Sequence, residues 1–104
     1  MAIARRQGEA AIVVDGAVRD IETSREIGLP VYARAVTPAT GKWRVETVGV
    51  NVPVTICGVA VNAGDIVAAD DSGLCFVPLD AAVTVLAHAA GIAADEKRRQ
   101  ARSA

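Results

Sequence analysis

Three charged side chains near the start of the sequence have the types and spacing of a small-molecule site. Asp15, Arg19 and Asp20 follow Ala10–Val14, a short apolar run typical of a buried strand. Ligands of open α/β sheets bind outside the carboxyl ends of the strands, which is where these side chains are expected. A carboxylate such as Asp20 can hold Mg²⁺ directly or through its waters, and the planar guanidinium of Arg19 can pair bidentately with a carboxylate or an enolate oxygen. Together they could bind a 2-oxoacid.

A structural role for the same two residues stays open. Asp20 could cap a helix that begins there, and Arg19 could pair with Glu22 or Glu26 further along that helix. Both interpretations place Asp20 at the first turn of a helix.

Other residues that often carry chemistry are sparse. The sequence has no glycine-rich dinucleotide or phosphate loop, no His-Glu-x-x-His and no Gly-x-Ser-x-Gly. The single histidine, His88, has no acidic or thiol partner at sequence spacing, which favours a packed or surface histidine. Cys57 and Cys75 lie in apolar β-like segments without a Cys-x-x-Cys spacing, so we expect buried free thiols rather than a metal site.

Length and composition predict one compact domain. The chain has 104 residues, of which 52% are hydrophobic but only 3% aromatic, so we expect a core of Val, Ile, Leu and Ala. The net charge of −1 gives no reason to expect nucleic acid or membrane partners, and the basic stretch from Lys97 to Arg102 is typical of a solvated helix end. No apolar run reaches the roughly 20 residues of a membrane span, and no signal-peptide pattern is present, which predicts a cytoplasmic protein.

The first half of the chain is expected to form strand and helix units around the three charged residues. A helix over Met1–Gly8 lacks a capping residue before it, and the strand that follows should stop at the turn dipeptide Asp15-Gly16. The expected elements after it are a helix over Arg19–Ile27, a strand over Val31–Val36 and a polar loop over Thr37–Lys42.

The second half changes to a period near two, which predicts antiparallel strands. Valines alternate with polar residues from Val45 to Ile56, and three further strands are expected around two turns. These strands are Val59–Val61, Ile66–Ala69 and Leu74–Val77. A final helix should start with Asp80 as its N-cap and run to about Gln100.

Four ordered motifs resemble the RraA-like family of small-oxoacid aldolases. The resemblance runs from Glu9 to Glu96 and corresponds to the C-terminal half of the family's domain. The motifs are Val14–Asp20, Gly28–Ala33, Val50–Val54 followed by Gly58–Asp65, and Ala69–Leu74 followed by Val77–Pro78. The resemblance implies an α/β fold, namely a layered ββα swivelling-type domain truncated at its N-terminus, with residues 1–104 forming one RraA-like domain. It also implies a homotrimer or a hexamer.

The same resemblance implies a function. Similar members are 4-hydroxy-4-methyl-2-oxoglutarate aldolases, lyases that release pyruvate and often also decarboxylate oxaloacetate. By this resemblance Asp20 matches the metal-binding aspartate and Arg19 the substrate-binding arginine, and both are expected to be catalytic. The implied cofactor is Mg²⁺ or another divalent cation such as Mn²⁺, and the implied partner is a small 2-oxoacid.

Full-length members of the family carry about as much chain again before the matched part. That part includes a glycine-containing loop that holds the substrate carboxylate and a further acidic residue. Glu96 could reach a neighbouring subunit's site, or it could lie on solvated helix surface. Two alternatives to an aldolase therefore remain: a non-catalytic regulator that binds ribonuclease E, as other members do, and an inactive truncated member.

Overall fold

The computed structural model describes residues 1–103, which divide into two compact units. The N-terminal unit comprises Met1–Val50, and the C-terminal unit begins at Asn51. The candidate residues Asp15, Arg19 and Asp20 all belong to the N-terminal unit.

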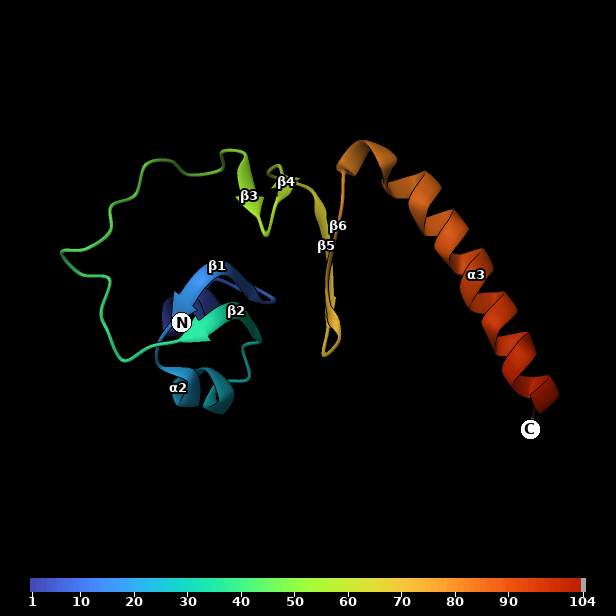
Figure 1. Ribbon diagram of the computed structural model, residues 1–104, viewed down its shortest axis with the longest axis horizontal. Coiled ribbons are helices and arrows are strands. Elements are labelled where there is room, and N and C mark those ends of the chain that lie inside the picture. Colours follow the sequence, from blue (N-terminus) through green and yellow to red (C-terminus); the bar gives the residue numbers. More distant parts are fainter. Residues whose placement is uncertain (104) are drawn as a thin grey trace. The chain divides into compact units, whose positions relative to one another are not determined.

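The N-terminal unit is a strand, helix, strand arrangement preceded by a short helix (Figure 1). Its strands β1 and β2 pair in parallel, with Ile12 opposite Val31. Because parallel neighbours need a crossover connection, α2 lies between them in the chain. The elements of this unit are α1 (Ala2–Arg6), β1 (Ile12–Val18), α2 (Ile21–Glu26) and β2 (Val31–Val36).

Strand β1 extends beyond its expected end, so the predicted turn at Asp15-Gly16 is wrong. The register shifts between Val14 and Ala17, where two residues of β1 face one residue of β2. The dipeptide is therefore a β-bulge, and pairing with β2 resumes after it. The bulge keeps Asp15 inside the strand rather than in the loop that was predicted for it.

The buried residues of this unit lie in α2 and in the turn that leads from it to β2. Leu29 is 2% exposed and Ser24 is 4% exposed. The Ser24 hydroxyl donates to the Leu29 carbonyl at 2.8 Å, and the Leu29 amide donates to the Ser24 carbonyl at 3.1 Å. Gly28 adopts a φ of 69° between them, a conformation that glycine reaches without steric cost. These hydrogen bonds terminate α2 and fix the direction in which the chain enters β2.

The segment between β2 and β3 contains no strand, although its alternating valines predicted antiparallel strands from residue 45 onward. Residues 44–53 form turns, bends and irregular chain and belong to none of the strand pairs within residues 1–103. Alternating residues form a β-strand only when another strand hydrogen-bonds to them. No strand within residues 1–103 pairs with this segment. Only the end of the predicted region, Val54–Ile56, is confirmed as a strand.

The C-terminal unit contains two antiparallel hairpins and a long helix (Figure 1). Cys57 and Gly58 connect the first hairpin with φ values of 48° and 81°, as a two-residue type I′ turn requires. In the second hairpin the Asp70 carboxylate accepts hydrogen bonds from the Ser72 and Gly73 amides at 2.7 and 3.2 Å. The elements are β3 (Val54–Ile56), β4 (Val59–Val61), β5 (Ile66–Asp70), β6 (Gly73–Val77), η1 (Leu79–Ala81) and α3 (Ala82–Ser103).

Three local predictions for the C-terminal unit need correction. Asp80 does not cap the final helix, because it lies inside the 3₁₀ turn η1 and α3 starts at Ala82. Cys57 and Cys75 are free thiols as predicted, but both are exposed rather than buried. Their hairpins are only two strands wide, so apolar neighbours in sequence do not provide cover in space.

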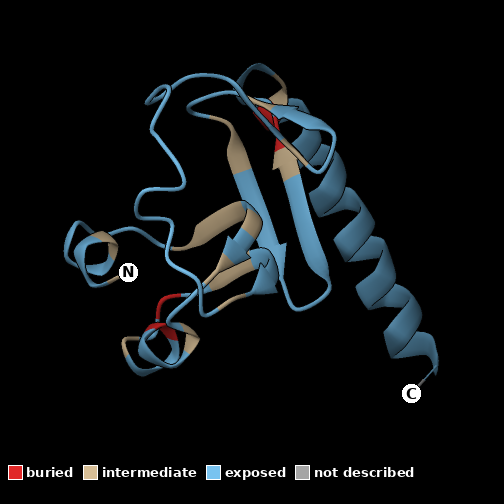
Figure 2. Cartoon of the chain, turned by 60° about the vertical axis from the view of Figure 1, so that its left-hand side comes forward, coloured by how far each residue is buried: buried red, intermediate tan, exposed pale blue. Residues whose placement is uncertain are grey.

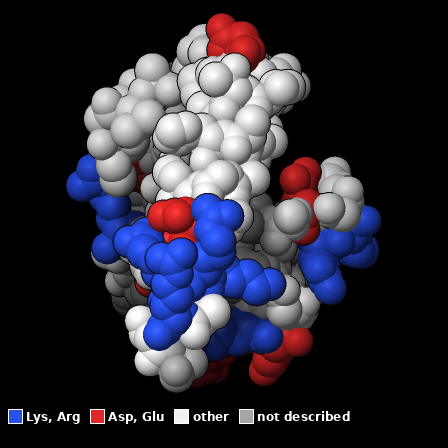
Figure 3. All heavy atoms as spheres, turned by 90° about the vertical axis from the view of Figure 1, so that its right-hand side faces the viewer, with Lys and Arg blue, Asp and Glu red and all other residues white. Residues whose placement is uncertain are grey.

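Helix α3 is exposed along almost its whole length (Figure 2). Ala82 is its buried residue, and His88 is at the surface, in agreement with the prediction of a packed or surface histidine. Lysine and arginine side chains gather at the far end of the helix (Figure 3). Among them, Arg98 and Arg99 pair with Asp95 at 3.2 and 3.5 Å, which is the solvated, charged helix end that was predicted.

Candidate functional site

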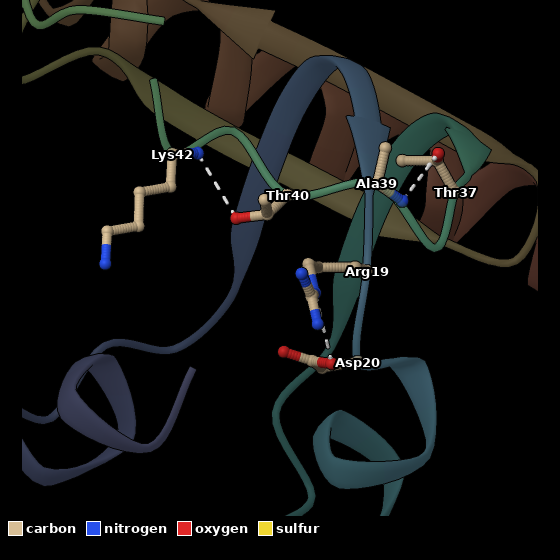
Figure 4. Close-up of polar contacts among 6 residues, drawn as sticks. All are labelled: Arg19, Asp20, Thr37, Ala39, Thr40 and Lys42. Atoms are coloured by element: carbon tan, nitrogen blue, oxygen red, sulfur yellow. Dashed lines mark hydrogen bonds and ion pairs between the residues drawn. The ribbon is translucent and has the colours of Figure 1, made fainter. Parts of the chain in front are cut away.

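Arg19 and Asp20 occupy the connection between the end of β1 and the start of α2 (Figure 4). The Thr37 amide, directly after β2, donates to the carbonyl of Val18 at 2.9 Å. This bond holds the loop after β2 beside the end of β1. The carboxyl ends of two parallel strands therefore meet at one edge, where α/β folds bind ligands, and the predicted location of Arg19 and Asp20 is confirmed.

The backbone of Asp20 is left-handed, with φ 60° and ψ 40°. Asp20 occupies the N-cap position of α2, but its side chain makes no capping hydrogen bond there. The alternative in which its carboxylate caps the helix is therefore wrong. A left-handed residue other than glycine costs about 1 kcal/mol, although Asp tolerates it better than most. A carboxylate kept in a costly conformation, and not used by the helix, suggests a role in function.

Arg19 pairs with Asp20 and not with the glutamates of α2. The Nε atom of Arg19 lies 3.4 Å from Oδ1 of Asp20, and the two side chains are 48% and 60% exposed. An ion pair this exposed contributes between zero and about 1 kcal/mol to stability. The pair is thus a weak structural contact, and both groups remain accessible to a ligand.

A second ion pair, between Arg34 and Asp15, was not predicted from the sequence. Arg34 of β2 pairs with Asp15 in the bulge of β1, across the two parallel strands. Asp15 lies within the bulge, and Arg34 lies on the stretch of β2 opposite it. The signal in the sequence was a lone arginine inside the apolar run Val31–Val36, which a buried strand would not contain without a partner. Asp15 is therefore assigned to the support of the sheet rather than to the ligand.

The donor set of this edge fits a hydrated divalent cation. No cluster of three or more His, Cys, Asp or Glu side chains within residues 1–103 could enclose a metal ion. Mg²⁺ does not need such a cage, because it keeps several waters and often takes one or two carboxylates together with substrate oxygens. Asp20 can supply one such carboxylate, with Arg19 beside it for an anionic substrate.

The N-terminal unit thus combines a parallel strand pair with an arginine and an aspartate at its carboxyl edge, the edge at which α/β folds bind ligands. The model of a family described as RraA-like (Aldolase/RraA) matches residues 1–76. The chain belongs to the RraA-like family, which confirms the resemblance seen in its motifs.

Two solved structures share the fold. A crystal structure from Pseudomonas syringae pv. tomato aligns with a TM-score of 0.89 at 31% identity, over 93% of this chain and 48% of its own. Streptomyces coelicolor RraAS2, described as an unusual member of the RNase ES inhibitor RraA protein family, aligns with a TM-score of 0.86 at 35% identity, over 94% of this chain and 50% of its own. The predicted α/β, RraA-like fold is confirmed.

Relatives in sequence include a 4-hydroxy-4-methyl-2-oxoglutarate aldolase. That protein, from Thermus thermophilus, is 42% identical over 77 residues, which are 73% of this chain and 46% of the relative. A relative from Halalkalibacterium halodurans is 33% identical over 100 residues, which are 96% of this chain and 47% of the relative. The chain thus spans about half the length of these relatives.

Two further predictions concern Glu96 with the oligomeric state, and the absence of a membrane span. Glu96 lies on the exposed surface of α3 in the C-terminal unit, and a role for it in a neighbouring subunit stays a prediction, as does the trimer or hexamer. None of the helices within residues 1–103 has both the length and the apolar character needed to cross a membrane.

Proposed function

We propose that this chain carries the metal and substrate residues of a divalent-metal-dependent lyase. The substrate class is 4-hydroxy-4-methyl-2-oxoglutarate and related 2-oxoacids, with pyruvate as a product and oxaloacetate decarboxylation as a second activity. The observation that supports this most directly is Asp20, held left-handed at a strand end with no capping bond and with Arg19 beside it. The aldolase name of the Thermus relative supports the same reaction.

Each residue has a defined task in this proposal. The Arg19 guanidinium binds the carboxylate of the 2-oxoacid through its planar fork. The Asp20 carboxylate holds Mg²⁺ or Mn²⁺. The cation, when bound, acts as a Lewis acid toward the keto oxygen. Arg19 fixes the orientation of the substrate, so that the bond to be cleaved lies next to the polarised keto group.

The test is pyruvate release from both substrates by the purified chain, with Mg²⁺ or with EDTA. Asp20→Asn keeps the size of the side chain but removes its charge, and we expect at least a hundredfold loss of metal-dependent release. Arg19→Lys keeps the charge but removes the fork, and should mainly raise KM. Glu22→Gln, two residues further along in α2, is the matched control and should retain activity. Release that is equal with EDTA, or equal in Asp20→Asn, would overturn the proposal.

Regulation of a ribonuclease is the second candidate, favoured by the likeness to Streptomyces RraAS2. In that case the chain would bind ribonuclease E with no need for the metal carboxylate. A pull-down of ribonuclease E by the wild type and by Asp20→Asn distinguishes the two candidates. Equal capture by both proteins, with no pyruvate release, supports the regulator. Neither capture nor release would indicate a family member without either activity.

A further inference from the structure

The N-terminal unit exposes several large apolar residues close together in one short segment. We call residues 43–50 the valine segment, and all of them are exposed. Trp43 is 92% exposed, Val48 is 91% exposed, and Val45 and Val50 are each 77% exposed. The Nζ atom of Lys42 lies 5.6 Å from the centre of the Trp43 ring, at a fully exposed site. Single apolar residues are ordinary at a surface, but four large ones within eight residues are a concentration that marks a place where another polypeptide binds.

Strands β1 and β2 of the same unit are only partly covered. Parallel strands occur almost only in sheets that are covered on both faces, and a two-stranded sheet is marginal by itself. Here the parallel pair is two strands wide, and positions 33–36 of β2 are all exposed. Figure 2 shows this exposure continuing from the end of β2 into the segment that follows it. The sheet and the valine segment therefore need cover together.

The accessible surface of the whole chain, both units together, is larger than that of compact folded bodies of the same mass. The 10.7 kDa chain exposes 8384 Å². Two separate folded bodies of half that mass would together expose about 6,600 Å² by the usual scaling with mass. The difference is larger than the roughly 800 Å² that one partner buries in a standard interface.

We propose that the valine segment is a docking surface for one kind of polypeptide: the half of the RraA-like fold that lies outside the match to this chain. The two solved structures align over 93% and 94% of this chain, but those matches cover only 48% and 50% of their own chains. The remaining half of each is a polypeptide of the right size that accompanies this fold. A second copy of this chain would bring the same partly covered parallel pair, not the other half of the fold.

The test uses the part of Streptomyces coelicolor RraAS2 that the alignment leaves unmatched. This part is co-expressed with the 104-residue chain, and only the chain carries an affinity tag. We expect co-purification as a one-to-one complex, and at least tenfold slower amide hydrogen exchange across residues 43–50 than in the chain alone. Binding is read without any assay of activity, so failure of the aldolase proposal would not affect the result.

Variants locate the surface. Val48→Asp with Val50→Asp places two charges in the valine segment and should weaken binding at least tenfold. Gln100→Asp with Ala101→Asp places the same charges on the exposed end of α3 and should bind like the wild type. Equal binding by both double variants would overturn the proposal. Self-association of the chain that protects residues 43–50, with no capture of the RraAS2 part, would also overturn it.

A fused protein covers the case in which the RraAS2 part does not fold by itself. The same part is joined to the chain through a flexible linker, and hydrogen exchange is measured again over residues 43–50. Protection in the fused protein, lost in Val48→Asp with Val50→Asp, supports the proposal. Exchange as fast as in the isolated chain would overturn it.

Discussion

Replacing Asp65 should loosen the C-terminal unit more than replacing the exposed carboxylate of Asp71. Oδ2 of Asp65 accepts the Asn62 amide at 2.9 Å, and Oδ1 accepts the Leu79 amide at 3.2 Å. The side chain therefore joins the turn after β4 to the start of η1, 14 residues further along the chain. Hydrogen bonds to a charged group contribute about 1.5 to 3 kcal/mol each, and less where water has access. We expect Asp65→Ala to lower the free energy of unfolding by about 2 kcal/mol.

The assay is urea denaturation followed by circular dichroism, combined with amide hydrogen exchange. The amides of Asn62 and Leu79 should exchange faster in Asp65→Ala, because both lose their acceptor. Asp65→Asn keeps one carbonyl oxygen and should lose about half as much stability. Asp71→Ala is the matched control, since that carboxylate makes no hydrogen bond or ion pair with any residue from 1 to 103. A loss below about 0.5 kcal/mol in Asp65→Ala, or one equal to that of Asp71→Ala, would refute the reasoning.

Two further predictions concern single residues. Asp20→Gly should be about 1 kcal/mol more stable than Asp20→Ala in denaturant titrations, because only glycine adopts a φ of 60° without cost. Both variants lose the carboxylate, so equal stability of the two would contradict the left-handed conformation. Cys57 and Cys75 should both react with a thiol reagent in the native protein, since both are exposed, and a titre of fewer than two thiols per chain would contradict this.

Local signals in the sequence predicted the elements that depend on neighbours in the chain. The second hairpin follows from the turn residues 70–73 between two apolar runs, and its strands pair as that turn requires. The end of α2 follows from Gly28 and Pro30 in the same way. In these cases a few adjacent residues determine the conformation.

The predictions that failed depend on residues far away in the sequence. Asp15-Gly16 is a common turn dipeptide, but pairing with β2 keeps it within β1 as a bulge. The alternating valines of residues 45–52 fit a strand, but a strand forms only where another strand lies beside it. The exposure of Cys57 and Cys75 likewise depends on what covers each hairpin. Periodicity describes which faces are apolar and cannot say what packs against them.

The candidate site also combines features that follow from neighbouring residues with features that depend on distant ones. Its place was predictable, because charged residues after an apolar strand lie at the ligand-binding edge of an α/β sheet. The left-handed backbone of Asp20 and the ion pair between Asp15 and Arg34 were not predictable, since they depend on the bulge and on the partner strand. The pattern thus identifies the residues, and the fold decides which of them face a ligand.

A polypeptide bound over the N-terminal unit would affect how rigidly the candidate site is held. Catalytic groups accelerate a reaction when packing holds them in place before the substrate arrives. Arg19 and Asp20 are attached to a parallel pair whose unit buries little besides Ser24 and Leu29. A polypeptide that covers the valine segment and the exposed part of β2 would restrict the motion of both strands, and with them the two candidate side chains. Binding at the docking surface and catalysis at the strand edge are therefore expected to be coupled, because both depend on the same two strands.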